Sequence, residues 1–384
     1  MSNTLGRSCI ASMLLSAAAL CVPLAAAEPS ASAPIESAPI ESVPFQAGTD
    51  GYFTYRIPSL LVTPKGTLLA FCEGRKTTVH DDGDNDLVLR RSFDRGKTWG
   101  PLQLVHEEGG DAIITVGNPC AVVDRETGVV WLTMNKENGV VLITSSADDG
   151  KSWSPIRDIS AEVVRPGWGW YAMGPGCGVQ LRHGKHKGRL VIPANHRTTK
   201  DRSGPSSSHV IYSDDHGKSW KIGGDVGPHT NECQVAELHD GTLVINCRNH
   251  WGRSGKDPSK KGKRVVAEST DGGLTWGEPI LDEELPEPTC QAGLIAMTKP
   301  AADGKTRLVF SNPAARSRDR MTVRLSEDGG ETWPKALLVH PGSTGYSAPA
   351  EIGEATIGLL YERAEYREIA FTTIELVRVQ PLKN

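Results

Sequence analysis

The pattern of hydrophobic and polar positions predicts short β-strands along most of the chain. Short apolar runs are separated by 41 glycines and 25 prolines, and few segments keep a helical period of 3.6 residues. The run "TYRIPSL" at 54–60 illustrates the pattern, because Tyr55 and Ile57 are typical strand residues and Pro58 suits the beginning or edge of a strand. Arg56 interrupts this run, and a charged side chain entering a core needs a partner.

Five segments share the pattern Ser-x-Asp-x-Gly-x-Thr/Ser-Trp, beginning at residues 92, 146, 213, 269 and 326. Each copy predicts a hairpin turn. The Ser and Asp side chains bond nearby backbone amides, and Gly takes the positive φ. We expect the Thr and Trp to begin the next strand, with the indole packed over the turn. The acidic residues of the repeats are therefore turn formers rather than catalysts.

The spacing of the repeats sets the expected architecture. Consecutive copies start 54, 67, 56 and 57 residues apart, which is room for four short antiparallel strands and their connections. A body of about 340 residues then makes six such units. The sequence therefore predicts an all-β fold, a six-bladed β-propeller of four-stranded antiparallel blades, whose closure avoids long open edges.

Composition and the N-terminal region indicate an exported protein. Residues 1–27 resemble a signal peptide, with Arg7, an apolar stretch and "AAA" before Glu28. Residues 28–42 are rich in Pro, Ser and Ala and predict a spacer, which leaves 43–384 as the folded body. No other run approaches the roughly 18 apolar residues of a membrane helix. The net charge of −4 gives no field that would select nucleic acid or an anionic membrane.

Neither a metal nor an organic cofactor is expected. Six cysteines remain in the body, none in a Cys-x-x-Cys pair, so a zinc site is not indicated and buried thiols are expected, although disulfides stay open. A calcium loop built from Asp82, Asp84 and Asp86 fails, because no Gly follows Asp86 and Phe93 occupies the twelfth position. The six cysteines are Cys72, Cys120, Cys177, Cys233, Cys247 and Cys290.

The repeats resemble the Asp-boxes of sialidases and related propellers. Outside them the chain resembles the exo-α-sialidases (neuraminidases), similar to glycoside hydrolase family 33, from "YRIPSLLV" to "LYERAEYREIAF". The resemblance implies a retaining enzyme that removes terminal sialic acids from glycoproteins, glycolipids or oligosaccharides. Sialylated glycans are then its partners.

Three arginines are expected to hold the carboxylate of the sugar, since planar guanidinium groups bind this group bidentately. By resemblance they are Arg56, Arg248 in "LVINCRNH" and Arg318 in "SNPAARSRDRMTVRLS". Arg320 stands where the family has Asn, and Arg316 lies close by, so the third position is the least defined.

The resemblance also supplies the catalytic residues. Asp81 aligns with the acid/base aspartate, with Asp82 and Asp84 as alternatives, and Tyr346 in "GSTGYSAP" aligns with the nucleophile. Glu232 in "TNECQVAEL" is its expected partner. A neutral phenol avoids the repulsion that a carboxylate would meet at an anomeric carbon bearing its own carboxylate, which explains the departure from the two-carboxylate scheme.

Further residues are expected around the sugar. Glu362 matches the glutamate that pairs with the first arginine, and Arg75 resembles another arginine of the family, with a solvated surface role as its alternative. Segments around Asn118, 168–176 and 191–197 resemble stretches that line the N-acyl and glycerol side, or else pack the blades. Asn195 stands where relatives often have tyrosine.

Two other functions are also consistent with the sequence. A non-catalytic glycan-binding propeller would keep the repeats for folding and lack the nucleophile pair, whereas this chain has both Tyr346 and Glu232. A trans-sialidase, or an enzyme that forms an anhydro product, would keep the site and change the outcome of the reaction.

Overall fold

The computed structural model describes residues 38–110, 112–251 and 258–382. The expected signal peptide (1–27) and most of the expected spacer (28–42) lie outside these residues. The first described strand, β1, begins at Glu41, just before the expected start of the folded body at Val43.

Nearly all regular structure in the described residues is β. Four of its five sheets hold four or five strands, in the orders β2-β3-β4-β5, β11-β6-β7-β8-β9, β10-β13-β14-β15 with β12 beside β13, and β16-β17-β18-β19. Their bounds are β2 (Thr54–Val62), β3 (Leu68–Arg75), β4 (Asn85–Ser92), β5 (Gln103–His106), β6 (Val116–Val123), β7 (Val130–Lys136), β8 (Val140–Ser146), β9 (Arg157–Asp158), β10 (Tyr171–Met173), β11 (Gly176–Cys177), β12 (Val179–Gln180), β13 (Leu190–Arg197), β14 (Ser206–Ser213), β15 (Lys221–Pro228), β16 (Thr230–Glu237), β17 (Leu243–Asn249), β18 (Lys263–Ser269) and β19 (Ile280–Pro286).

The fifth sheet has eight strands and joins the two ends of the described chain. Its order is β1-β25-β24-β23-β22-β21-β20, with β26 beside β23. The long strand β23 pairs with β22 through residues 335–343 and with β24 through residues 344–353. The bounds are β1 (Glu41–Gln46), β20 (Gly293–Ala296), β21 (Leu308–Pro313), β22 (Asp319–Ser326), β23 (Lys335–Gly353), β24 (Thr356–Arg363), β25 (Glu368–Glu375) and β26 (Gln380–Pro381), and the short helices are α1 (Ser160–Val163), η1 (Pro258–Lys260) and η2 (Leu376–Arg378).

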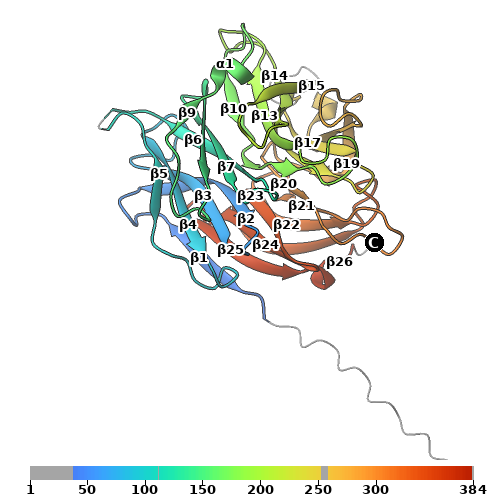
Figure 1. The fold of residues 1–384 in the computed structure, drawn as a ribbon. Coiled ribbons are helices and arrows are strands. Elements are labelled where there is room, and N and C mark those ends of the chain that lie inside the picture. Colours follow the sequence, from blue (N-terminus) through green and yellow to red (C-terminus); the bar gives the residue numbers. More distant parts are fainter. Residues whose placement is uncertain (1–37, 111, 252–257, 383–384) are drawn as a thin grey trace, which may run out of the picture. The chain divides into compact units, whose positions relative to one another are not determined.

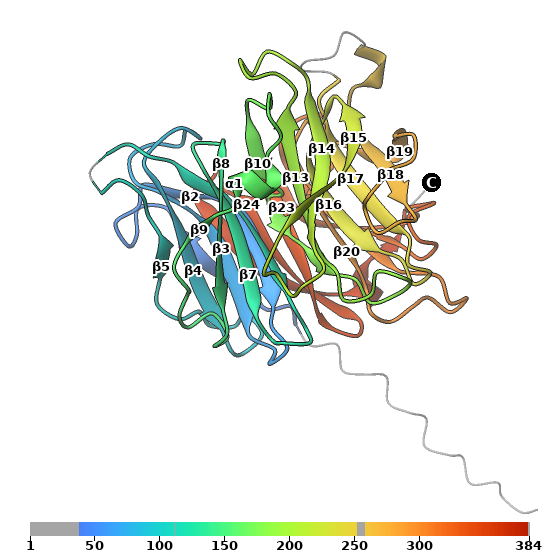
Figure 2. The ribbon, with the colours of Figure 1, turned by 45° about the horizontal axis from the view of Figure 1, so that its top comes forward.

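The sheets follow one another around a ring, each packed against the next through a buried apolar cluster. One cluster joins β2–β4 to β6–β8, and further clusters join the successive sheets up to β24 and β25. A last cluster, with Leu60 of β2 and Ala348 of β23, joins the first sheet to the C-terminal strands. Figures 1 and 2 show the blue first sheet beside the red C-terminal strands. The arrangement is propeller-like and all-β, as the sequence predicts.

All five repeats form the same turn, at the ends of β4, β8, β14, β18 and β22. In the first, the Asp94 carboxylate accepts hydrogen bonds from the Ser92 hydroxyl (2.8 Å), the Thr98 amide (2.9 Å) and the Thr98 hydroxyl (2.6 Å). The other four copies repeat this pattern of bonds. Gly96 adopts φ 87° and lies against Phe371, leaving no room for a Cβ.

The position of the repeat tryptophan differs between copies. In the third copy the expectation is confirmed, because the Trp220 indole donates to the Gly217 carbonyl of its own turn at 3.1 Å and Trp220 directly precedes β15. In the first two copies it is wrong. Trp99 precedes β5 by several residues instead of beginning it, and its ring packs edge-on against Phe371 of β25. Trp153 likewise contacts Phe71 in the neighbouring sheet. These indoles therefore fill the space between sheets, where more apolar area is buried than over a small turn.

The cysteines of the body are free thiols, and five of the six are buried. Cys177 alone among them is partly exposed. Within the described residues, no helix combines the length and the apolar character that crossing a membrane requires.

Candidate active site

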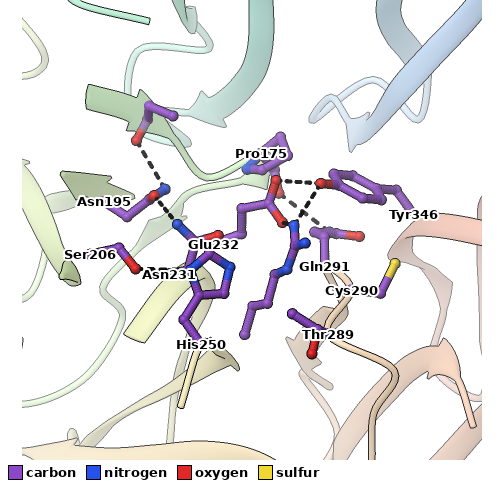
Figure 3. A network of polar contacts seen from close by, with 12 residues as sticks. Pro175, Asn195, Ser206, Asn231, Glu232, His250, Thr289, Cys290, Gln291 and Tyr346 are labelled. Atoms are coloured by element: carbon purple, nitrogen blue, oxygen red, sulfur yellow. Dashed lines mark hydrogen bonds and ion pairs between the residues drawn. The ribbon is translucent and has the colours of Figure 1, made fainter. Parts of the chain in front are cut away.

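Tyr346 and Glu232 come from β23 and β16 and meet in the interior. The Tyr346 hydroxyl donates a hydrogen bond of 2.5 Å to Glu232 Oε1, and Figure 3 shows the two side chains pointing toward one another. Both are buried, with 6% and 7% of their surface exposed. Burial, and then the Glu232 carboxylate, raise the pKa of the Tyr346 phenol well above its ordinary value. The phenol is therefore neutral and has its proton directed at a carboxylate.

Arg248, at the end of β17, completes this pair. Its Nη1 donates to Glu232 Oε2 at 2.6 Å and to the Tyr346 oxygen at 3.1 Å. Burial opposes the charge on Arg248, but the Glu232 carboxylate outweighs it, and the pKa of Arg248 is raised. Its Nε is buried and donates to no described residue. The site thus keeps a guanidinium donor for which the described protein offers no acceptor.

Glu362, in β24, is the partner that Arg56 requires. Its Oε1 accepts from Arg56 Nε at 2.7 Å and from the Ile57 amide at 2.9 Å, and its Oε2 accepts from the Tyr346 amide at 2.8 Å. One fully buried carboxylate thereby positions both Arg56 and the backbone that carries Tyr346. Ile57 has φ 64°, a strained conformation for a β-branched residue, and its amide is turned toward Glu362.

Arg318 is the third arginine that faces Tyr346. Its guanidinium carbon lies 5.6 Å from the centre of the Tyr346 ring, and that of Arg56 lies 5.7 Å away. Arg318 donates to the Tyr366 hydroxyl and to the Thr289 carbonyl, each at 3.3 Å. The competing candidates Arg316 and Arg320 are exposed. Arg56, Arg248 and Arg318 therefore surround one phenol ring and form the cationic part of the site.

Arg75 anchors the loop that carries Asp81. Arg75 is buried, so the alternative of a solvated surface role for this arginine is wrong. Its Nη2 donates to Asp81 at 2.8 Å and to Glu73 at 2.6 Å. The Asp81 side chain is 81% exposed. Partial burial favours its protonation, but the Arg75 charge outweighs this and lowers the pKa of Asp81 below its ordinary value. Asp84, one alternative acid, pairs with Lys76 instead.

Asn118 and Asn195 are engaged in structural hydrogen bonds. The Asn118 amide side chain donates to Asn138 at 2.9 Å, and its backbone amide donates to Glu73 at 2.9 Å. Asn195 accepts from Asn231, the neighbour of Glu232, at 2.7 Å (Figure 3). In these contacts the two asparagines hold the backbone around the site.

Sequence reasoning missed three residues that position the site. Glu73 links Arg75 to the backbone of Asn118, and Tyr366 lies under Arg56 at 3.9 Å while also contacting Arg318. Thr289 offers its carbonyl to Arg318 from a backbone with φ 57°. Only Glu73 carried a usable signal, namely a carboxylate two residues before a candidate arginine in an apolar strand.

The described part of the chain holds no group of three or more His, Cys, Asp or Glu side chains placed to bind a metal ion. The groups that the site itself offers are one phenol, carboxylates and guanidinium groups. An anionic ligand with a carboxylate suits the three arginines.

Comparison with known proteins shows which family the chain resembles over most of its length. The model of the BNR repeat-like domain family matches residues 66–360. The sialidase of Micromonospora viridifaciens is 38% identical over 82% of this chain and 50% of its own length, and that of Bacteroides fragilis is 33% identical over 88% and 64%. The solved Hadza microbial sialidase Hz136 superposes with a TM-score of 0.79 at 31% identity, covering 88% of this chain and 69% of that one.

The fold and the site therefore define a BNR-repeat propeller protein. The chain belongs to the sialidase family. It spans only half to two thirds of the length of the two bacterial relatives named above.

Proposed function

We propose that this protein is an exported, retaining exo-α-sialidase that acts on sialylated glycans through a covalent tyrosyl intermediate. The observation that carries the proposal is the 2.5 Å hydrogen bond from the Tyr346 phenol to Glu232, placed among three guanidinium groups. A binding module has no use for a buried phenol whose proton is directed at a base, whereas a nucleophile requires that base within hydrogen-bond reach.

The three arginines supply binding and orientation. Arg56, Arg248 and Arg318 receive the carboxylate on the anomeric carbon, which brings that carbon over the Tyr346 oxygen. Glu362 and Glu232 already neutralise two of these charges in the free protein. The site thus holds its guanidinium groups in place before the ligand arrives, so less ordering is required on binding.

The first chemical step breaks the glycosidic bond. The Tyr346 oxygen attacks the anomeric carbon while its proton passes to Glu232 Oε1, and Asp81 gives a proton to the departing oxygen. In the second step, water attacks the same carbon with Asp81 as the base, and the phenol regains its proton from Glu232. Two displacements retain the anomeric configuration.

The protonation state of Asp81 controls the first chemical step, because only the acid form can give a proton to the departing oxygen. Arg75 lowers the pKa of Asp81, so the free protein carries mostly the carboxylate form at neutral pH. The acid form becomes more populated as the pH falls. We therefore infer that turnover is faster in mildly acidic solution.

Six blades and export belong to the same proposal. The division of β23 between two pairing partners supports counting the eight-stranded sheet as two blades, with β1 completing the last.

Cleavage after residue 27 would release a protein that meets glycans outside the cytoplasm. N-terminal sequencing of the mature protein, with an intact residue 1 as the contrary result, tests the export part.

A mechanism-based label tests the enzyme proposal directly. A 3-fluoro sialosyl fluoride should leave a covalent adduct, because fluorine slows the hydrolysis of the intermediate through its oxocarbenium-like transition state. Peptide mapping should put the added mass on Tyr346. Tyr346→Phe should still bind a sialic-acid analogue but form no adduct, and Glu232→Gln should slow labelling without moving it. A label on Glu232 or Asp81 would refute the assignment of the nucleophile, and a folded protein that neither labels nor turns over any sialoside would refute the activity.

A further inference from the structure

A cavity of about 500 Å³ lies at the opposite ends of the strands that carry the site. Its lining comes mainly from β2, β6, β11, β12, β16, β20 and β23. In β2, Leu60 lines the cavity and follows Arg56 by four residues, which is about 13 Å of strand. The cavity is therefore a different place from the site around Tyr346.

A layer of hydrogen bonds lies between the two. Gln234 and Gln291 both donate to the Pro175 carbonyl, at 2.9 and 3.3 Å, and Ser59 donates to the Gly176 carbonyl at 2.8 Å. Along their strands, Gln234 follows Glu232 and Ser59 follows Arg56, each before the residues that line the cavity. A ligand in the cavity would thus not touch the arginines around Tyr346.

The cavity combines apolar walls with a charged rim. Residues such as Leu60, Val179, Leu294 and Ala296 form the walls. Its volume falls within the range of about 300–1,000 Å³ that is typical of small-molecule sites, which are mostly apolar with a few polar groups. The walls suit the hydrocarbon part of a ligand, and the rim decides which head group it takes.

The basic groups of the rim lack carboxylate partners. The Arg125 guanidinium makes no hydrogen bond or ion pair with any described residue, although its backbone amide is fixed by Gln180 at 2.7 Å. The Arg182 guanidinium donates to the Thr298 hydroxyl at 2.6 Å and pairs with no carboxylate of the described chain. The Arg125 side chain is exposed at the edge of the cavity.

The acidic groups of the rim, in contrast, already have donors. Glu237 accepts from the backbone amides of Arg182 and His183, at 2.6 and 3.0 Å. Glu351 accepts from the amide and the hydroxyl of Thr298, at 3.1 and 2.6 Å. The Arg125 guanidinium is therefore a charged donor of the rim without a carboxylate partner, and its planar fork suits a carboxylate.

We propose that this cavity, hereafter the distal cavity, is a second binding site that takes an amphipathic carboxylate. The hydrocarbon body lies against the apolar walls, and the carboxylate accepts hydrogen bonds from Arg125 and Arg182. The proposal does not depend on the catalytic role of Tyr346, since no residue is shared between the two sites.

Calorimetric titration of the full chain with decanoate tests the distal cavity. A saturating sialic-acid analogue is present throughout, so that the arginines around Tyr346 are occupied. We expect saturable one-to-one binding, and weaker binding of decanol and acetate, which lack the head group and the hydrocarbon body. Arg125→Gln should weaken decanoate binding about tenfold, as expected for a lost charged hydrogen bond.

Two variants sharpen the result. Lys221→Gln removes one exposed positive charge from β15, the outermost strand of its sheet, and should leave the affinity unchanged. Ala296→Phe fills the distal cavity and should abolish binding while the protein keeps its sialoside turnover. The proposal is overturned by absence of saturable binding at millimolar decanoate, by equal affinity in Arg125→Gln, by equal binding of decanol, or by binding seen only without the sialic-acid analogue.

Discussion

Glu362→Gln isolates the carboxylate that joins Arg56 to the backbone of Tyr346. The substitution keeps the size of the side chain and replaces one acceptor oxygen by an amino group. If the remaining oxygen serves Arg56 and Ile57, the amino group faces the Tyr346 amide, which is itself a donor. In the reverse orientation it faces Arg56 and Ile57. No rotamer of glutamine satisfies all three donors.

The contacts set the size of the expected effect. Glu362 is fully buried and Arg56 is 7% exposed, so the variant leaves a guanidinium inside the protein without its counter-ion. Removing one partner of a buried ion pair costs about 3–5 kcal/mol of unfolding free energy. A backbone shift at Tyr346 of about 1 Å would also lower kcat/KM by about a hundredfold.

Urea unfolding and kinetics with a fluorogenic sialoside measure both consequences. Glu368→Gln is the matched control, because Glu368 pairs with Arg363 at 2.6 Å in a partly exposed position on the adjacent strand. Such a pair contributes about 0–1 kcal/mol, and its loss should not affect kinetics. Wild-type stability in Glu362→Gln would refute the ion-pair argument, and lost stability with unchanged kcat/KM would show that Glu362 does not position the site.

Three further perturbations test other parts of the structure. Arg56→Lys keeps the charge but loses the planar fork, so the inhibition constant of a sialic-acid analogue should rise by about thirtyfold, and an unchanged constant would remove Arg56 from the clamp. Asp81→Ala should slow sialosides with alcohol leaving groups far more than those with acidic phenols, which depart without a proton, whereas equal losses would exclude Asp81 as the acid. The pKa of Asp94 is lowered from 3.8 to about 2 by the Thr98 hydrogen bonds, so its contribution to stability is present above pH 3.8 and is lost as the pH falls toward 2. Asp94→Ala should therefore lose stability near neutral pH and show a shallower acid dependence, without loss of turnover per folded molecule, and an unchanged melting curve would contradict the turn interpretation.

The fold could be predicted because the repeat encodes its own local structure. Ser92, Asp94 and Gly96 meet within one turn, so their roles follow from short-range hydrogen bonds and backbone preference. The packing position of the Trp99 indole could not be predicted in the same way, since its contact with Phe371 joins residues that are far apart in the sequence. Contacts of that kind depend on how sheets follow one another around the ring.

The residues of the site also separate into those that the sequence predicts and those that only long-range contacts identify. Tyr346, Glu232 and Arg248 are brought together as predicted, although their roles remain predictions. Tyr366 could not be found, because its part in the site depends on a long-range contact with Arg318 and on lying under Arg56. Arg75 shows the converse error, because its surface alternative ignored the buried Glu73 two residues earlier.

A shared irregularity explains how strands can deliver polar side chains to this site. The pairing register shifts at residues 56–59 of β2, 117–120 of β6, 230–233 of β16 and 344–347 of β23. These short segments hold Arg56, Asn118, Glu232 and Tyr346. A bulge changes the direction of side chains and interrupts the alternation of buried and exposed positions. The functional residues can therefore leave the strand pattern near the start of β2, β6 and β16, and at the point of β23 where its pairing with β24 begins. The pairing that follows keeps the sheets packed and the site in place.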